Sequence, residues 1–415
     1  MFYLPKYCLL TMKKHFSLII LLCLSVLIAP AQTKLKTGTW RGVLKPAAGE
    51  LPFNFEVKDT AGHQQLTILN ASERFKVNDV KFTDDSVFIH MPLFDSEFRL
   101  KQEQGSTLTG RFIKHLGDRD AITPFMAQQG IKWRFFQLPE KSAYNISGRW
   151  SAVFGEGAER DTTVGEFVQT GNKITGTFLT TTGDYRYLEG AVSGNKLYLS
   201  CFDGGHAFLF TADIQDGKTL TNGLFGSTPW TALKNANAKL PDAYSLTVLK
   251  PGYSKINFSF PDLDGKKVSL DDARFKNKVV ILQVMGSWCP NCMDETAYLV
   301  NYYKKFHAKG VEVAGLAYER TVDFEKSKKA VLQEKQHFNI PYPLLLTGYT
   351  NNKKETAKSL PMLSNFLAFP TTIIIDKKGN VRKIYTGFSG PGTGTYYTEF
   401  VNNFERLTES LLAEK

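Results

Sequence analysis

Two cysteines three positions apart are the residues of this chain best suited to chemistry. The sequence Trp-Cys-Pro-Asn-Cys at 288–292 comes two residues after the apolar segment 279–285. A strand that leads through Cys-x-x-Cys into a helix is typical of a thiol–disulfide switch. The unpaired N–H groups and positive dipole end of that helix favour a thiolate at Cys289. Pro290 suits the first helical position, and Cys292, one turn on, is placed to attack a mixed disulfide formed at Cys289.

Two other uses of a cysteine pair are disfavoured by the rest of the sequence. A zinc site needs about four ligands, and the chain contains no second Cys-x-x-Cys and no His pair. A purely structural disulfide would close a very small loop and so constrain the unfolded chain little. We therefore expect a redox-active pair, with no metal and no cofactor.

Length and charge limit the classes of protein to consider. A chain of 415 residues is expected to hold two or three domains. The net charge of +11 is spread along the sequence without a dense Lys/Arg block. We therefore expect a solvated basic surface and no nucleic-acid partner, with peripheral association at anionic membranes as a further prediction.

The N-terminus has the pattern of an export signal. Lys13 and Lys14 precede the apolar run 16–28, and Ala-Pro-Ala follows at 29–31. This predicts a signal peptide over residues 1–31, with Met12 as an alternative start, and a place in the periplasm or extracytoplasmic cell envelope. A membrane anchor is the alternative, but the run is shorter than the roughly 20 apolar residues of a span.

Export changes the reading of the cysteines. Cleavage leaves Cys201, Cys289 and Cys292, so one intramolecular pair can form. A dithiol that works in an oxidising compartment needs an envelope redox partner. Cys201 lies in a strand-like segment and is expected to be a buried, inert thiol, because free cysteines pack as small hydrophobes.

The first half of the chain reads as antiparallel β structure. Short alternating apolar runs are separated by Gly, Asn and Asp. A Gly-x-Trp strand recurs at 38–44 and 148–154, and later matches keep a similar offset. We expect two tandem β units, over residues 33–138 and 139–235, and a linker over 236–256.

The remaining residues, 257–415, show an alternating α/β pattern. Such alternation predicts a central sheet with helices on both faces, and the turn 377–380 makes the last two strands antiparallel. Strands are expected at 279–285, 311–317, 342–346, 371–376 and 381–386, and helices at 290–308, 323–338, 354–366 and 396–412.

Several motifs in this region together resemble one family. They are the opening segment 258–266, the cysteine motif 288–292, Glu295 in the following helix, Phe369-Pro370-Thr371 before an apolar strand, and the loop 387–394. Residues 257–415 resemble the exported TlpA/ResA-like thiol–disulfide oxidoreductases of the thioredoxin superfamily. The β units carry no comparable resemblance.

The resemblance implies roles for particular residues. Cys289 matches the nucleophile and Cys292 the resolving thiol. Pro370 matches a cis-proline beside the disulfide, where the backbone of Phe369 pairs with an extended substrate; an ordinary trans turn is the alternative. Trp288 is expected to contact partners, with a plain core aromatic as the alternative.

Glu319 matches a glutamate that helps proton movement at the resolving cysteine. A carboxyl near apolar walls suits that task; the alternative is a solvated loop residue. Gln283 stands where thioredoxin has a buried aspartate, which leaves Glu319 as the better relay candidate, or no relay at all. Peroxiredoxins share the fold but place Thr where this chain has Gly286, so peroxidase chemistry is disfavoured.

These observations predict an exported enzyme, a protein thiol–disulfide oxidoreductase that exchanges with protein disulfides. The resemblance favours a reductase with duties similar to cytochrome maturation. Two alternatives remain open. One is a redox-sensitive binding protein whose β region recognises protein or glycan. The other is a Cu(I)-handling protein, because thiolates bind Cu(I) well.

Overall fold

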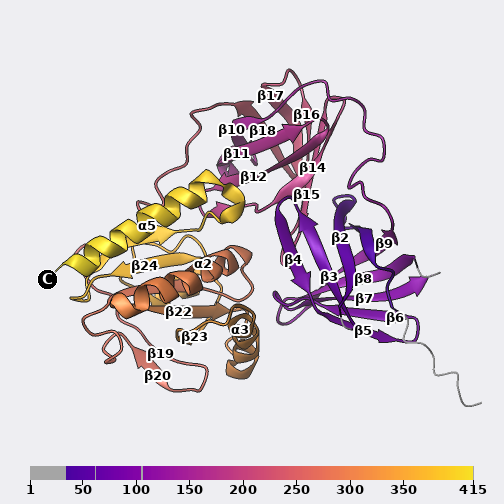
Figure 1. Cartoon of the computed structure of the whole chain (residues 1–415). Helices are drawn as coiled ribbons and strands as arrows, with labels where there is room; N and C mark the ends of the chain where they lie inside the picture. The colour runs from indigo at the N-terminus through magenta and orange to yellow at the C-terminus, as the bar shows by residue number, and fades with distance from the viewer. Residues whose placement is uncertain (1–33, 61, 104–105, 415) are drawn as a thin grey trace, which may run out of the picture.

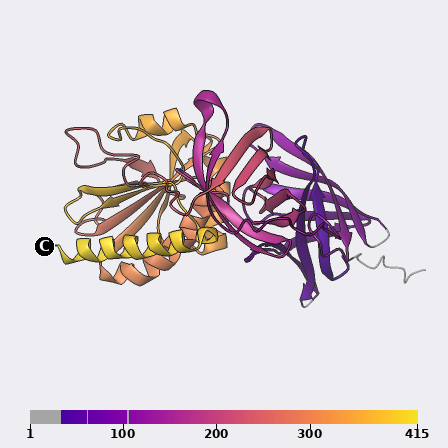
Figure 2. The same cartoon turned by 90° about the horizontal axis from the view of Figure 1, so that it is seen from above.

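The computed structural model describes residues 34–60, 62–103 and 106–414, which form two β units and an α/β domain (Figure 1). The expected signal peptide lies outside these residues. Figure 2 shows the α/β domain on one side and both β units on the other. None of the described helices combines the length and the apolar character needed to cross a membrane.

The first β unit is one antiparallel sheet in the order β4-β3-β2-β1-β9-β8-β7-β6-β5. Its inward side chains are mostly aromatic and aliphatic, and the cavity that they leave measures only about 10 Å³. The strands are β1 (Gly38–Leu44), β2 (Leu51–Thr60), β3 (His63–Asn70), β4 (Glu73–Val77), β5 (Asp79–Thr83), β6 (Ser86–His90), β7 (Ser96–Glu103), β8 (Thr107–His115) and β9 (Asp120–Gln129).

The second β unit is a sheet that closes on itself, because β11 pairs with β12 as well as with β10. Closure leaves few free strand edges. The strands are β10 (Gly148–Phe154), β11 (Asp161–Thr170), β12 (Lys173–Thr180), β13 (Gly183–Asp184), β14 (Leu188–Ser193), β15 (Lys196–Phe202), β16 (Ala207–Ile214), β17 (Thr219–Phe225) and β18 (Thr228–Lys234).

The internal repeat is visible in the details of the two units. Trp40 in β1 and Trp150 in β10 are fully buried, and each indole N–H donates to the carbonyl four residues earlier, at 2.8 and 2.9 Å. Each of these strands pairs with the next strand and with the last strand of its sheet. The expected divisions at 138/139 and 235/236 fall between β9 and β10 and just after β18.

The α/β domain has a central sheet in the order β23-β22-β21-β24-β25. β22 and β23 run parallel to β21, whereas β24 and β25 are antiparallel, as expected for the last two strands. The elements are β19 (Ser259–Pro261), β20 (Lys267–Ser269), β21 (Val279–Met285), α2 (Pro290–Phe306), β22 (Val311–Glu319), α3 (Phe324–Phe338), β23 (Leu344–Thr350), α4 (Lys353–Ser359), β24 (Thr371–Ile375), β25 (Val381–Thr386) and α5 (Thr395–Ala413).

Two elements differ from the sequence prediction. The helix expected over 354–366 ends at Ser359, because Pro361 disfavours helical backbone at the residue before it, Leu360. The strand expected over 342–346 begins only after Pro343, at Leu344, and extends to Thr350. Both corrections leave the cysteine motif unaffected, since it follows the central strand β21.

Candidate active site

The two cysteines lie at the start of α2, after a short turn that follows the end of β21. Cys289 is the N-cap residue, and its Sγ accepts a hydrogen bond of 3.3 Å from the backbone N–H of Cys292. Pro290 occupies the first turn. That N–H group and the positive end of the helix dipole both face this sulfur. Cys289 is therefore placed to act as the nucleophile.

Cys292 sits in a different environment from Cys289. Both are free thiols, but Cys292 is fully buried whereas Cys289 keeps 6% of its surface exposed. Burial raises the pKa of the Cys292 thiol well above its ordinary range, and the Cys289 sulfur adds to this shift. One sulfur is thus arranged to attack, and the other to hold its proton until the second step.

The segment before β24 lies against the nucleophile. The Phe369–Pro370 peptide bond is cis, and the Phe369 carbonyl oxygen lies 3.7 Å from the Cys289 Sγ. Half-buried Trp288 meets the Phe369 ring edge-on at 5.3 Å, and its indole N–H donates to the Tyr318 carbonyl at 2.8 Å. The residues expected to contact a substrate therefore do lie around Cys289.

Comparisons with known proteins agree with this geometry. A profile described as the AhpC/TSA family matches residues 251–384. The thiol-disulfide oxidoreductase ResA of Bacillus subtilis (strain 168) is 30% identical over 139 residues, covering 34% of this chain and 69% of that protein. The thioredoxin-like protein YneN of the same strain is 30% identical over 142 residues, covering 34% of this chain and 73% of that protein.

The chain belongs to the ResA-like thiol–disulfide oxidoreductases. The C-terminal domain carries this membership, and the β units lie outside the matched region. Among solved structures, a thiol:disulfide interchange protein from Chlorobium tepidum TLS is 22% identical. The likeness covers 40% of this chain and 100% of that chain, with a TM-score of 0.30.

A buried polar group lies on the inner side of the ResA-like dithiol. The side-chain amide of Gln283 donates to the Cys292 carbonyl and to Thr296 Oγ1, both at 3.2 Å. Beside it, Glu295 is 1% exposed and accepts a hydrogen bond from Thr372, which follows the cis-proline segment. Burial raises the pKa of Glu295 to about 7. A carboxyl that titrates near neutral pH is suited to exchange a proton with a buried thiol.

Glu319 is buried at the end of β22, where the solvated-loop alternative would have left it exposed. Its two carboxylate oxygens accept hydrogen bonds from the backbone N–H and hydroxyl of Ser287, at 2.8 and 2.7 Å. Burial raises the pKa of Glu319, against the effect of those hydrogen bonds. Glu319 is thus hydrogen-bonded to the residue before Trp288. Its proton-relay role stays a prediction.

A cavity of about 190 Å³ joins Glu319 to a second buried carboxyl, Glu334 of α3. Burial, with a smaller contribution from Glu319, raises the pKa of Glu334 to about 8. Sequence reasoning missed Glu334, because a lone glutamate on a helix carries no signal of burial.

Cys201 lies in a different environment from the two active-site cysteines. It is fully buried in the core of the second β unit, and burial raises the pKa of its thiol well above the ordinary range. This environment is that of an inert thiol. Among the residues that the structure describes, no group of three or more His, Cys, Asp and Glu is placed to hold a metal ion.

The outer side of the dithiol is formed by residues that sequence reasoning did not single out. The side chain of Arg186, only 1% exposed, forms ion pairs with Glu73, Asp203 and Asp294. Asp294 lies on α2, Asp203 in the second β unit and Glu73 in the first. The Arg186 side chain therefore connects the active-site helix to both β units.

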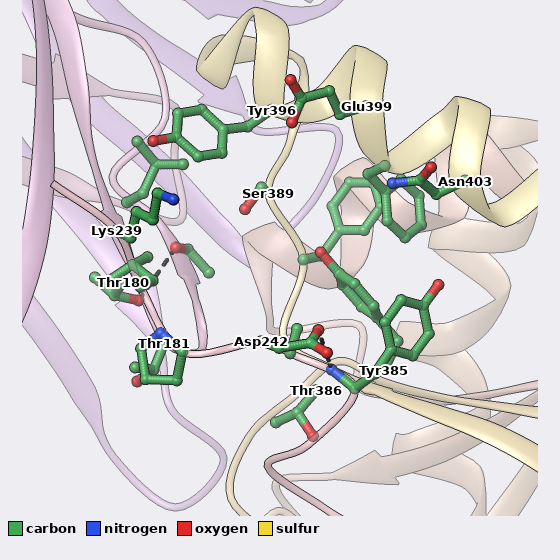
Figure 3. Close-up of a pocket in the computed structure, with 18 of the residues that line it drawn as sticks. Thr180, Thr181, Lys239, Asp242, Tyr385, Thr386, Ser389, Tyr396, Glu399 and Asn403 are labelled. Carbon is green, nitrogen blue, oxygen red and sulfur yellow. Dashed lines mark hydrogen bonds between the residues drawn. The ribbon is translucent and has the colours of Figure 1, made fainter. Parts of the chain in front are cut away.

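A larger cavity, of about 410 Å³, lies at the junction of the second β unit, the linker and α5. Figure 3 shows Thr180 and Thr181 on one side of it, and Tyr396, Glu399 and Asn403 of α5 on the other. Ser389, from the loop that follows β25, lies between them. This cavity marks the edge of the contact between the β region and the α/β domain.

Proposed function

We propose that the chain is an exported thiol–disulfide oxidoreductase that uses Cys289 and Cys292 to reduce protein disulfides. The observation that carries the proposal is the position of Cys289. Its sulfur caps α2, accepts the N–H of Cys292 and faces the carbonyl that precedes the cis-proline. Family membership supports the reaction type, and the signal-like N-terminus supports a place in the cell envelope.

The reaction proceeds in two exchanges. The Cys289 thiolate attacks one sulfur of the partner's disulfide, and the other partner sulfur leaves as a thiolate that takes up a proton. Cys292 then loses its proton and attacks the Cys289 Sγ, which forms the Cys289–Cys292 disulfide and releases the second partner thiol. The partner gains two electrons and the dithiol loses two, so an envelope dithiol donor must restore the starting state.

Proton transfer from Cys292 limits the second exchange, because burial keeps this thiol protonated. Two buried carboxyls are candidates for the acceptor. Glu319 is the one implied by the resemblance to the family. Glu295 acts on Cys292 electrostatically, since its charge contributes to the raised pKa of that thiol. We propose Glu295 as the direct proton acceptor, because its charge acts on Cys292, and Glu319 as a second group in the relay.

The direct test is to trap the reaction between its two exchanges. In Cys292→Ser the mixed disulfide at Cys289 cannot be resolved, so an envelope extract should yield a covalent adduct that reductant releases. The double variant Cys289→Ser/Cys292→Ser is the matched control and should yield none. An absence of adducts in the single variant, or equal adducts in both, would exclude exchange through Cys289.

A further inference from the structure

The β units cover the face of the dithiol that a protein partner must reach. We propose that this arrangement is a closed, self-inhibited state, in which the second β unit occupies the partner's place and has to move away before exchange. This inference rests on the proposed function, because it concerns access to the same sulfur.

One part of the cover is the segment 182–187 of the second β unit. It lies along the loop after β25, where the Asp184 carboxylate accepts the backbone N–H of Gly390 at 2.7 Å. It also lies against the cysteine motif: a Cβ built on Gly183 would meet the Asn291 side chain at 1.9 Å. The segment therefore lies between that loop and the start of α2.

A second part of the cover is the loop 203–206, between β15 and β16. A Cβ built on Gly205 would lie 2.8 Å from the ring of Pro290 and 2.9 Å from Phe94 of the first β unit. Pro290 and Asn291 are thus both in contact with the second β unit. These are the residues between the two cysteines, which a protein partner would have to approach in order to reach Cys289.

A buried charge cluster holds the cover in place. Arg186 connects Asp294, two residues after Cys292, to Asp203 and Glu73 of the two β units. Burial opposes ionisation of Asp203, but His206 and Arg186 hold its pKa well below the ordinary range. The carboxylate thus stays charged and paired. Of these pairs, only Arg186–Asp294 joins the β units to the α/β domain, so this pair stabilises the closed arrangement and acts as the latch.

The contacts indicate which parts would separate. The two β units are joined by an apolar contact, since Phe202 of the second unit stacks on Phe53 of the first at 4.4 Å within the first unit's core. Against the α/β domain, the second unit instead offers glycines, backbone groups and ion pairs, and Thr180, Thr181 and Gly183 line the 410 Å³ cavity (Figure 3).

Polar domain contacts of this kind separate more readily than large apolar ones. The apolar exceptions are Met293 and Phe338, which pack against the core of the first unit, and Tyr396, which packs against Val164 and Leu179 of the second. We therefore expect the β units to move as one body about residues 236–242, because residues 243–254 of the linker are hydrogen-bonded to the α/β domain. Exchange with a protein disulfide would then scale with the open fraction of the chain.

A bulkier side chain at a contact point of the cover tests this inference. The backbone of Gly205 is outside the left-handed region, so Gly205→Val adds only the clash with Pro290 and Phe94. Ser227→Val, on an exposed turn of the same unit, is the matched control. The measurement is the rate of iodoacetamide alkylation at Cys289 in the reduced full chain, resolved from Cys201 by peptide mass and from Cys292 by the fragment ions of their shared peptide.

We expect alkylation at Cys289 to be at least about tenfold faster in Gly205→Val than in the wild-type chain and in Ser227→Val. A second variant, Asp294→Asn, removes the charge on α2 that pairs with Arg186. It should increase the alkylation rate at Cys289 by a similar factor. Its control, Glu405→Gln, removes a carboxylate that pairs with Lys305 on the same domain and should change nothing.

The outcomes separate this inference from the proposed function. If both opening variants fold, and alkylate no faster than wild type and controls, the cover does not limit access and the inference is wrong. That conclusion would stand even if the dithiol reduced insulin at the wild-type rate. If the variants alkylate faster and yet no variant reduces a protein disulfide, the cover is real and the proposed function is wrong.

Discussion

The inner and outer sides of the active-site turn are built from different parts of the chain. On the inner side, Gln283 and Glu295 belong to the α/β domain itself and surround the buried Cys292. On the outer side, Arg186 and Gly205 come from the second β unit and cover the residues between the cysteines.

The contrast separates the chemistry of the site from the access to it. In the proposed mechanism the inner groups govern when Cys292 gives up its proton, and they lie within residues 251–384, which match the AhpC/TSA family. The outer groups govern what reaches Cys289, and they lie outside that region. Substitutions on the inner side should therefore change the reaction rate and its pH dependence. Substitutions on the outer side should change the stability of the chain and the accessibility of Cys289.

The largest effect is expected at the nucleophile, where both sides meet. Cys289→Ala removes the attacking sulfur, so the rate of protein disulfide reduction should fall by at least about a thousandfold. Insulin reduction with dithiothreitol as donor measures this rate. Cys201→Ala is the control and should retain the wild-type rate, because that thiol lies in the core of the second β unit. A similar loss in both variants would contradict the assignment.

On the outer side, the expected effect is on stability. Arg186→Met leaves three carboxylates without their shared cation, and Asp203 among them is fully buried. Breaking such a cluster should lower the free energy of unfolding by about 3–5 kcal/mol. Urea denaturation measures it. The control, Arg149→Met, breaks the half-exposed ion pair with Glu166 and should lower the free energy of unfolding by less than about 1 kcal/mol. Equal losses would mean that the buried cluster contributes no more to stability than an exposed ion pair.

On the inner side, Glu295 should make stability depend on pH. Its pKa of about 7 in the folded chain lies above the ordinary 4.5. The folded chain therefore keeps a proton that the unfolded chain has lost. The contribution is fully present below about pH 4.5 and is lost as pH rises through 7, by roughly 3 kcal/mol at most.

Glu295→Gln cannot ionise and should lose this dependence. We expect the wild-type chain to lose stability relative to the variant between about pH 5 and about pH 8 in parallel thermal melts. The pH profile of disulfide reduction should also lose an inflection near 7 in the variant. Parallel stability curves and unchanged rate profiles would show that Glu295 stays in one protonation state.

A smaller effect is expected for Glu319. Glu319→Gln keeps the size of the side chain but replaces one of the two oxygens that accept from Ser287 by a donor. Reduction should slow by a few-fold, at an unchanged content of reactive thiols, because a buried relay carboxyl is lost. Stopped-flow rates across pH measure this. Rates that match the wild type at every pH would remove Glu319 from the relay.

The sequence predicts the inner side well, because the signals are local. The apolar run that forms β21 is buried along its whole length, and the cysteine motif follows it directly, so strand, turn and helix were predicted at their observed positions. The repeated Gly-x-Trp strands likewise revealed two β units, since each tryptophan fills the same core position.

The outer side could not be predicted in this way. Arg186 lies 113 residues from Glu73 and 108 residues from Asp294, and no periodicity or motif connects them. Gly205 reads in the sequence as an ordinary turn residue. Its importance arises only from the packing of three units around one helix end, which single-sequence patterns do not encode.

The most direct test of the account is to follow both sulfurs during turnover. The reduced full chain is mixed with a protein disulfide, quenched with acid and digested, and the peptides carrying Cys289 and Cys292 are weighed. We predict that one disulfide forms between these two cysteines for each partner disulfide reduced, while Cys201 stays a thiol. If partner disulfides disappear while Cys289 and Cys292 remain unlinked, the central claim is contradicted.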